Sequence, residues 1–325
     1  MTKLQRILLN APPVQFVIRK SKRIRLPGFQ SMPLYDVVTF FLKQVKKQGL
    51  NDRAAAISFQ AMMAVPPATI FLCTLIPYLP ATKQITRELL RLTHDIFLDK
   101  NVAGLARDFL LDFLNTQRGG LLSLGFLLVV FYSSNAMMGI MRAFNKSLIY
   151  STRRTGLESR WMAIKLTSLL IVLVLATVLL LVTQGALFRM VMEWANIQAA
   201  SWRWIIKLLR WVIIIALIFY MIAFMYKYAP AVHKRWKLTS PGTVLATLLI
   251  ILTSVIFSYW VTNFGSYNKV YGSIGTILII MILLYLNSLI LLVGFELNVS
   301  IHSLKFMAEE NDSSAIDAPS GELPG

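Results

Sequence analysis

The chain has 325 residues, of which 56% are hydrophobic and 15% are charged. Soluble globular domains carry about 25% charged residues, so this composition excludes an ordinary soluble protein and indicates an integral membrane protein. The net charge of +18 does not indicate nucleic-acid binding, because the basic residues gather at the ends of apolar runs, where they orient a membrane protein.

Residues 1–50 form a predicted basic arm. From the first residue through Arg53 the chain has eleven basic residues and only two acids, Asp36 and Asp52. The segment PLYDVVTFFLKQVKKQ predicts one apolar helical face, with its lysines toward the other. The residues of that face are Leu34, Val37, Val38, Phe41, Leu42 and Val45. This pattern predicts an amphipathic helix that lies on the cytoplasmic face of the membrane.

Six apolar runs are long enough to cross a bilayer, which takes about 20 helical residues. They predict an all-α fold, a polytopic bundle of six transmembrane helices. The runs cover residues 54–79, 119–141, 163–188, 205–226, 242–264 and 272–301. The membrane domain is therefore expected over 51–303, followed by an acidic, disordered cytoplasmic tail over 304–325.

The connecting loops differ in charge. The loops after the second and fourth runs are basic, whereas the loop 81–118 has nearly balanced charge. Because basic loops stay in the cytoplasm, we expect both termini to be cytoplasmic and the protein to be a multi-pass protein of a bacterial inner membrane. Loop 81–118 has helical spacing and is expected to form a helical hairpin on the outer face.

The first run contains Pro66 and Pro67 side by side, and we predict a helix kink there. Proline inside a soluble helix costs about 3 kcal/mol, but hydroxyl groups in a membrane bundle can satisfy the freed carbonyls. Ser58, Thr69 and Thr74 are the nearby candidates. The kink either shapes a cavity or lets the helix pack around a neighbour.

Glu296 is almost the only acid inside the runs, and ionisable groups in a bilayer usually have a role. Arg142 closes the second run at the same depth, so we expect a buried Arg142–Glu296 pair. Asn145 and Asn298 lie beside these two residues in the sequence and complete a predicted inner clasp or gate. The alternative is that Glu296 only holds two helices together or reaches the lipid headgroups.

The fourth run begins with SWRWIIKLLRW, in which Arg203, Lys207 and Arg210 recur at helical spacing. They form one basic stripe on the outer half of the helix. Arginine matches phosphate oxygens in a bidentate way, so the stripe is a candidate site for a lipid headgroup or another anion. The alternative is that these side chains snorkel to the outer interface.

Other polar and small residues in the runs leave two interpretations open. Gly272, Ser273 and Gly275 either permit close helix packing or line a cavity. A further set either lines a hydrophilic path or makes hydrogen bonds between helices. These residues are Gln60, Ser133, Ser134, Asn135, Thr183, Gln184 and Asn287.

Enzyme chemistry has little support in the residues. His94, His233 and His302 are scattered, without the close ligand spacing of a metal site. Cys73 is the single cysteine, which leaves no disulfide framework and no zinc site. No glycine-rich phosphate loop or nucleophile elbow is present. We therefore expect no enzyme activity, no metal and no cofactor.

Three segments resemble the YihY/BrkB family of bacterial inner-membrane proteins. They are DRAAAISFQAMMAVPPATIFLCTLIP, RGGLLSLGFLLVVFYSSNAMMGIMRAFNKS and VYGSIGTILIIMILLYLNSLILLVGFELN. Departures are the proline pair, where many relatives have one proline, and the segments at both ends. The resemblance implies six spans in the bacterial cytoplasmic membrane and a role in envelope maintenance or lipid export. Some family members are labelled ribonuclease BN, a label that the residues of this chain disfavour.

Charge placement and the resemblance favour a protein that moves a lipid or amphiphilic anion across or out of the inner membrane. Membrane lipids are then its partners, and no nucleic-acid partner is expected. The alternative is a non-transporting scaffold that binds envelope proteins through loop 81–118 and the cytoplasmic arm. A transporter needs a cavity that reaches mid-membrane, whereas a scaffold should be tightly packed there. The oligomeric state stays open.

Overall fold

The computed structural model describes residues 12–25, 28–30, 32–78, 116–148, 152, 154–182, 200–232, 236–263 and 266–316, with scattered positions between 86 and 114. All regular structure in these ranges is helical, and the all-α prediction is confirmed. The elements are α2 (Pro12–Arg23), α3 (Leu34–Lys47), α4 (Leu50–Leu75), η1 (Ile76–Tyr78), α7 (Gly119–Ser147), α8 (Gly156–Val182), α10 (Ala200–Tyr228), α11 (Pro241–Asn263) and α12 (Ser266–Ile316).

Within the described part of the chain, six helices are long and apolar enough to cross a membrane. The spans are Leu50–Tyr78, Gly119–Ser147, Gly156–Thr177, Trp211–Tyr228, Pro241–Val261 and Ile277–Glu310. Helices suit this environment because they satisfy their own backbone hydrogen bonds where water is absent. The six-span prediction is confirmed.

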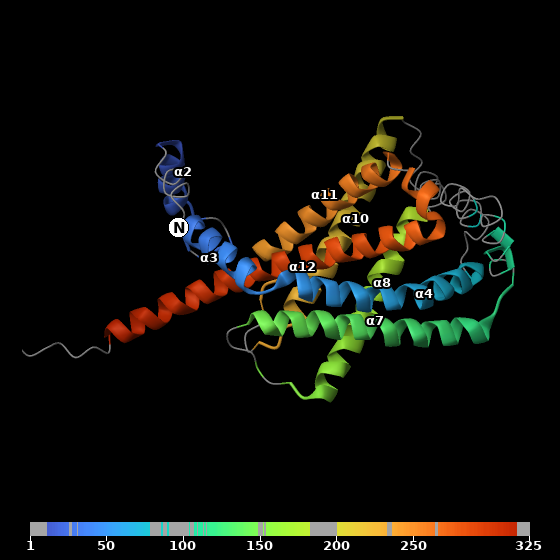
Figure 1. Ribbon diagram of the computed structural model, residues 1–325, viewed down its shortest axis with the longest axis horizontal. Coiled ribbons are helices and arrows are strands. Elements are labelled where there is room, and N and C mark those ends of the chain that lie inside the picture. Colours follow the sequence, from blue (N-terminus) through green and yellow to red (C-terminus); the bar gives the residue numbers. More distant parts are fainter. Residues whose placement is uncertain are drawn as a thin grey trace, which may run out of the picture.

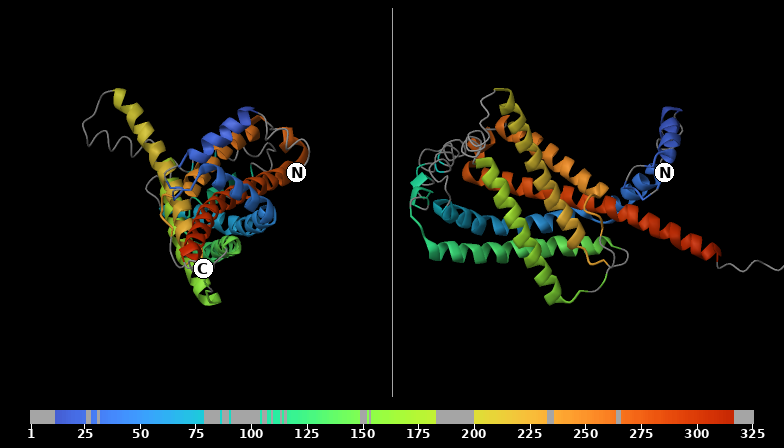
Figure 2. Two further views of the ribbon diagram at one scale, coloured as in Figure 1. Left: turned by 90° about the vertical axis from the view of Figure 1, so that its left-hand side faces the viewer. Right: turned by 180° about the vertical axis from the view of Figure 1, so that it is seen from behind.

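The six helices alternate in direction, so the start of α4 and the C-terminal part of α12 lie at the same end of the bundle (Figure 1). We name this end, which also carries α2 and α3, the arm end, and the opposite end the loop end. Contacts join α4 to α7, α7 to α8, α8 to α10, α10 to α11, α11 to α12 and α12 back to α4. The spans therefore form a closed ring, in which α8 and α10 run obliquely to α4, α7 and α12 (Figure 2).

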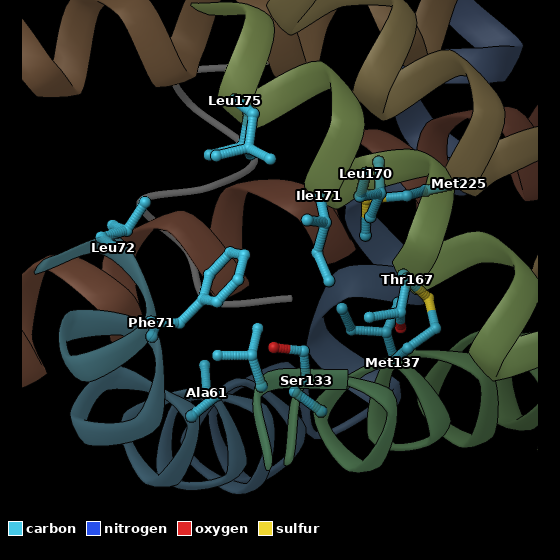
Figure 3. A pocket seen from close by; sticks show the side chains of 16 residues that line it. Ala61, Phe71, Leu72, Ser133, Met137, Thr167, Leu170, Ile171, Leu175 and Met225 are labelled. Atoms are coloured by element: carbon cyan, nitrogen blue, oxygen red, sulfur yellow. The ribbon is translucent and has the colours of Figure 1, made fainter. Parts of the chain in front are cut away.

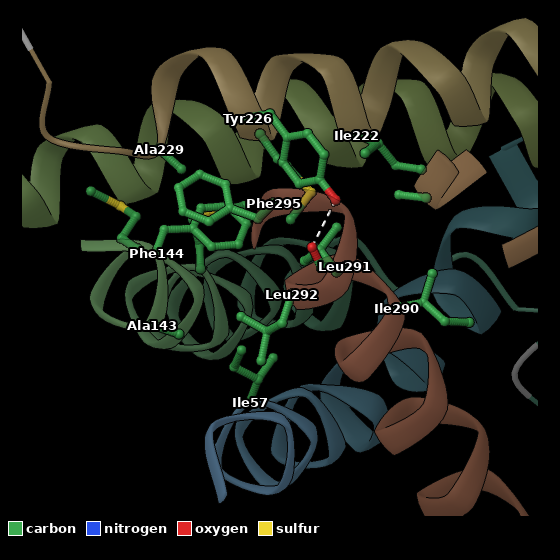
Figure 4. Close-up of a cluster of buried hydrophobic side chains, with 14 of the residues drawn as sticks. Ile57, Ala143, Phe144, Ile222, Tyr226, Ala229, Ile290, Leu291, Leu292 and Phe295 are labelled. Atoms are coloured by element: carbon green, nitrogen blue, oxygen red, sulfur yellow. Dashed lines mark hydrogen bonds between the residues drawn. The ribbon is translucent and has the colours of Figure 1, made fainter. Parts of the chain in front are cut away.

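The main core fills the arm half of this ring (Figure 4). Phe144 of α7 stacks on Phe295 of α12, with ring centroids 3.9 Å apart. Tyr226 of α10 meets both rings edge-on, and its hydroxyl donates to the carbonyl of Leu291 at 2.7 Å. Aromatic packing of this kind adds about 0.5–1.5 kcal/mol per pair beyond area burial, so α7, α10 and α12 are firmly joined at this level.

The arm helix α3 docks on α12. Val37 is fully buried and packs in one cluster with Leu297 and Ile301. Val38 and Leu42, on another side of α3, remain 42% and 52% exposed. The helix thus has a docked apolar face and a free one, and its position on the membrane surface stays a prediction.

Helix α12 continues to Ile316. The expectation of a disordered tail over 304–325 is therefore wrong for 304–316, while 317–325 lie outside the described residues. Extending an existing helix needs no new nucleus, which is why a polar sequence after a long apolar helix can remain helical. The hairpin predicted for 81–118 falls mostly outside the described residues and stays a prediction.

Both prolines lie inside α4. Pro66 is exposed and Pro67 is half-buried, and a kink at this point stays a prediction. The expected hydroxyl compensation is wrong. Ser58, Thr69 and Thr74 donate to the carbonyls of Ala55, of Val65, and of Ile70 and Phe71. The carbonyls that the prolines free, four residues before each, are those of residues 62 and 63.

Candidate functional site

A buried ion pair joins the first and last spans at the arm end. Glu296 of α12 is fully buried and Arg53 of α4 is 7% exposed. The Arg53 Nη2 atom lies 3.6 Å from Glu296 Oε1, and the hydroxyl of Ser147 on α7 donates to the same oxygen. Arg53 Nη1 donates to Ser147 Oγ at 2.6 Å. We name these three residues the Arg53–Ser147–Glu296 cluster.

The turn between α3 and α4 fixes Arg53. Gly49 adopts a left-handed conformation with φ of 57°, which glycine accepts without the steric penalty of a side chain. The turn places the carbonyl of Gln48 beside the guanidinium of Arg53. Arg53 Nε donates a hydrogen bond to this carbonyl at 3.0 Å. Nη2 donates to Gln48 Oε1 at 2.9 Å, and Nη1 donates to the carbonyl of Ala143 at 2.9 Å. Arg53 is thus held on all sides.

The predicted Arg142–Glu296 pair is wrong. Arg142 is exposed, and its Nε donates to the carbonyl of Met138 on the same helix at 3.3 Å. Ser147, five residues later, faces Glu296 instead. Five residues turn an α-helix by about 140° beyond a full revolution, so Arg142 and Ser147 cannot face the same neighbour. Sequence reasoning treated Arg53 as part of the flank of the first run and missed its role.

The two asparagines of the predicted clasp bind the segment between α10 and α11. Asn145 Oδ1 accepts from the amide of Ala231 at 2.8 Å. Asn298 Oδ1 accepts from the amide of Gly242 at 2.8 Å, and its Nδ2 donates to Ser240 Oγ at 2.8 Å. Both side chains satisfy backbone groups that would otherwise be buried without partners. Their contacts hold the arm end together.

Above this packed half lies a recess, which we name the α4–α7–α8 pocket (Figure 3). Its volume is about 300 Å³, and it is not fully enclosed. Ser133 and Thr167 contribute hydroxyls, and the rest of the lining is apolar. The lining residues are Ala61, Ala64, Ala68, Phe71, Leu72, Val129, Ser133, Ala136, Met137, Ile140, Thr167, Leu170, Ile171, Val174, Leu175 and Met225.

The α4–α7–α8 pocket lies at the level of the midpoints of two spans. Ala64 is the middle residue of the span Leu50–Tyr78, and Ser133 is the middle residue of the span Gly119–Ser147. Met137 and Met225 line the pocket and also belong to the buried core. They therefore form a floor that separates the pocket from the arm half of the ring.

A second recess of about 740 Å³, the α10–α11 groove, lies nearer the loop end. Its lining is mainly branched and aromatic. The residues are Trp211, Ile214, Ile215, Ile218, Ile250, Ile251, Ser254, Val255, Ser258 and Tyr259. The predicted basic stripe precedes this wall on the same helix: Lys207 and Arg210 stand seven and four residues before Ile214. Positions at this spacing share a helical face.

The side chains of Arg203, Lys207 and Arg210 lie outside the described residues, so their binding role stays a prediction. The same holds for Gly272 and Ser273. Of the other polar residues, Ser133 lines the pocket, and the hydroxyl of Ser134 donates to the carbonyl of Phe131 on the same helix. Asn135 Oδ1 accepts a hydrogen bond from Arg160 and so joins α7 to α8. Thr183 and Gln184 are outside the described part.

Among the described residues, buried oxygens without a hydrogen-bond partner occur on Gln30 near the arm and, within the spans, on Gln60, Thr167, Asn287 and Glu296. Polar atoms within the spans have few other partners. No group of three or more His, Cys, Asp and Glu side chains that could hold a metal ion is found in the described ranges.

A family model described as virulence factor BrkB matches residues 41–317. The chain belongs to the BrkB family. The matched region contains all six spans, the Arg53–Ser147–Glu296 cluster and both recesses, and the family resemblance noted in the sequence is confirmed.

Curated relatives of this BrkB-family chain are bacterial proteins. YfkH of Bacillus subtilis (strain 168), described as ribonuclease-like, is 28% identical over 264 residues, which are 80% of this chain and 93% of the relative. A UPF0761 membrane protein of Chromohalobacter salexigens is 27% identical over 75% of this chain and 58% of its own. Another, IL2447 of Idiomarina loihiensis, is 32% identical over 32% of this chain and 36% of its own. No solved structure matches the chain.

Proposed function

We propose that this BrkB-family protein helps move a lipid or another amphiphilic anion across a bacterial inner membrane. The observation that carries the proposal is the order of residues along α10. Its loop-end turns hold Arg203, Lys207 and Arg210, and its next turns form a wall of the apolar α10–α11 groove. A basic stripe next to an apolar groove suits a molecule with an anionic headgroup and hydrocarbon chains.

The arm half and the loop half of the ring differ in a way that supports this reading. The arm half is closed by the aromatic core and the Arg53–Ser147–Glu296 cluster. The loop half contains two recesses, of which the α4–α7–α8 pocket reaches mid-membrane. Recesses in one half of the bundle and a packed opposite half suit a transporter that binds its substrate in the loop half.

The experiment is a flip assay in proteoliposomes with fluorescent phosphatidylglycerol. The test variant carries Arg203→Gln, Lys207→Gln and Arg210→Gln. A basic residue near an anionic lipid surface is worth about 1 kcal/mol, so removing three should weaken headgroup binding on the order of a hundredfold. Flipping by the wild-type protein and its loss in the variant are the expected results.

The matched control is Lys20→Gln with Arg23→Gln and Arg25→Gln. It removes one lysine and two arginines as well, from exposed positions in or just after α2. The control should flip the probe at the wild-type rate. The transport proposal is wrong if the α10 variant also keeps that rate, or if the wild-type protein does not flip the probe. Either result would favour the scaffold alternative.

A further inference from the structure

We propose that the α4–α7–α8 pocket binds an acyl chain of a membrane phospholipid. The site is separate from the α10–α11 groove, and the proposal does not depend on transport. Its first argument is the shape of the walls. On α4 the wall includes Ala61, Ala64 and Ala68 together with the larger Phe71 and Leu72, and on α7 small residues such as Ser133 and Ala136 line the pocket.

Small side chains on neighbouring membrane helices usually let the backbones approach closely. Here α4 and α7 do pack together, and Gly125 lies close to the backbone of Phe71. Helix α8, however, crosses at an oblique angle, and its Leu170 and Ile171 face the small side chains across the pocket (Figure 3). The pocket therefore has two causes: the small side chains on α4 and α7, and the oblique direction of α8.

The apolar lining favours a hydrocarbon ligand over water. A buried water needs two to four polar partners, but the pocket offers only two hydroxyls. Of these, the Thr167 oxygen is covered by protein and makes no hydrogen bond, which leaves Ser133. An empty pocket would forfeit the dispersion contacts of its walls. A flexible aliphatic chain restores those contacts without requiring polar partners.

The position of the pocket along the spans indicates that a phospholipid supplies this chain. The pocket lies at the midpoint of the spans Leu50–Tyr78 and Gly119–Ser147, where acyl chains are the surrounding medium. Met137 and Met225 form its floor toward the arm end. Methionine is unbranched and adapts to irregular apolar surfaces. A chain that enters the pocket thus ends on these thioethers, at mid-membrane.

The test uses phosphatidylglycerol with a photoreactive diazirine at the end of one acyl chain. The full-length protein in nanodiscs is irradiated, and the labelled positions are mapped by peptide mass spectrometry. Labelling should concentrate on half-buried pocket residues such as Ala68 and Ile171. Phe59 and Leu127, which are 62% and 65% exposed on the outer surface, give the level of ordinary lipid contact.

Two variants fill the pocket from different helices, Ala64→Phe from α4 and Ala136→Phe from α7. Either one that elutes as a monodisperse protein should lose pocket labelling down to the Phe59 level. The matched control is Leu252→Phe on α11, a position 54% exposed and outside both recesses. It should keep the wild-type labelling pattern.

Wild-type labelling that is no stronger in the pocket than at Phe59 would overturn the proposal, whether or not the filled variants fold. Unchanged labelling in a folded filled variant would do the same. The variant with three neutralised residues on α10 should keep its pocket labelling even if it no longer flips the probe. The acyl-chain site and the transport function can therefore fail separately.

Discussion

The guanidinium of Arg53 lies 3.6 Å from the carboxylate of Glu296, and both side chains are buried. The pair ties the first span to the last, and Ser147 ties the second span to both. Such a pair does not by itself add much stability, because desolvation of the two charges offsets their attraction. Its main effect is that removal of either partner alone leaves the other charge buried without compensation, which destabilises the fold.

Replacing Arg53 by methionine should strongly destabilise the protein. The change leaves Glu296 buried without its cation, and breaking a buried pair in this way costs about 3–5 kcal/mol. We expect a clear fall in the midpoint of thermal unfolding in detergent, measured by the fluorescence of the buried aromatic core.

The double variant Arg53→Met with Glu296→Leu should recover much of this loss, since it removes both charges. Arg142→Met is the matched control, because Arg142 is exposed and bonds only to its own helix in the described contacts. An Arg142 variant as unstable as the Arg53 variant would contradict this assignment of the ion pair.

The partner of Glu296 could not be predicted from the sequence. Hydropathy alone singles out Glu296, because an acid inside an apolar run is rare. Several basic residues near the arm end lie at a similar depth, and each is a possible partner for Glu296. The choice among them depends on which face of α7 meets α12 and on the left-handed turn at Gly49. These are packing facts between distant segments, and no local pattern encodes them.

The contact between α11 and α12 should not tolerate larger residues at Gly294. A Cβ atom there would stand 2.5 Å from the hydroxyl of Tyr226 and 2.7 Å from the carbonyl of Gly242. We expect Gly294→Ala to lower the folded yield and the unfolding midpoint. Gly120→Ala is the control, because nothing lies within 4 Å of its new methyl group. Equal behaviour of the two variants would refute the close contact.

Span number follows from sequence because each run of about 20 apolar residues has only one stable structure in a bilayer. The recesses do not follow from it, since they arise from the oblique crossing of α8 and α10. Ser133 was named from its polarity, yet only its place opposite Ile171 assigns it to a pocket wall. Likewise, the sequence alone does not reveal that the turns of α10 after the predicted basic stripe line a groove.

Phe144→Ala should cost about 3–5 kcal/mol, the usual range for removing a large buried aromatic. Phe144 is fully buried and stacks on Phe295 while it meets Tyr226 edge-on. Chemical unfolding in mixed detergent micelles measures the change. Phe59→Ala, at a position 62% exposed, should leave stability almost unchanged. Similar losses for both variants would argue against a core centred on Phe144.

Membrane orientation is the last prediction, and it rests on charge. Basic loops at the arm end should keep that end in the cytoplasm. Cysteines placed at exposed Lys20 and Glu310 should therefore resist a membrane-impermeant maleimide in intact spheroplasts, whereas one at exposed Gln117, at the loop end, should react. The native Cys73 is buried and provides an unreactive background. Lysis should expose Lys20→Cys and Glu310→Cys to the reagent. Reaction of both before lysis, with Gln117→Cys protected, would reverse the orientation and place the α10–α11 groove toward the cytoplasm.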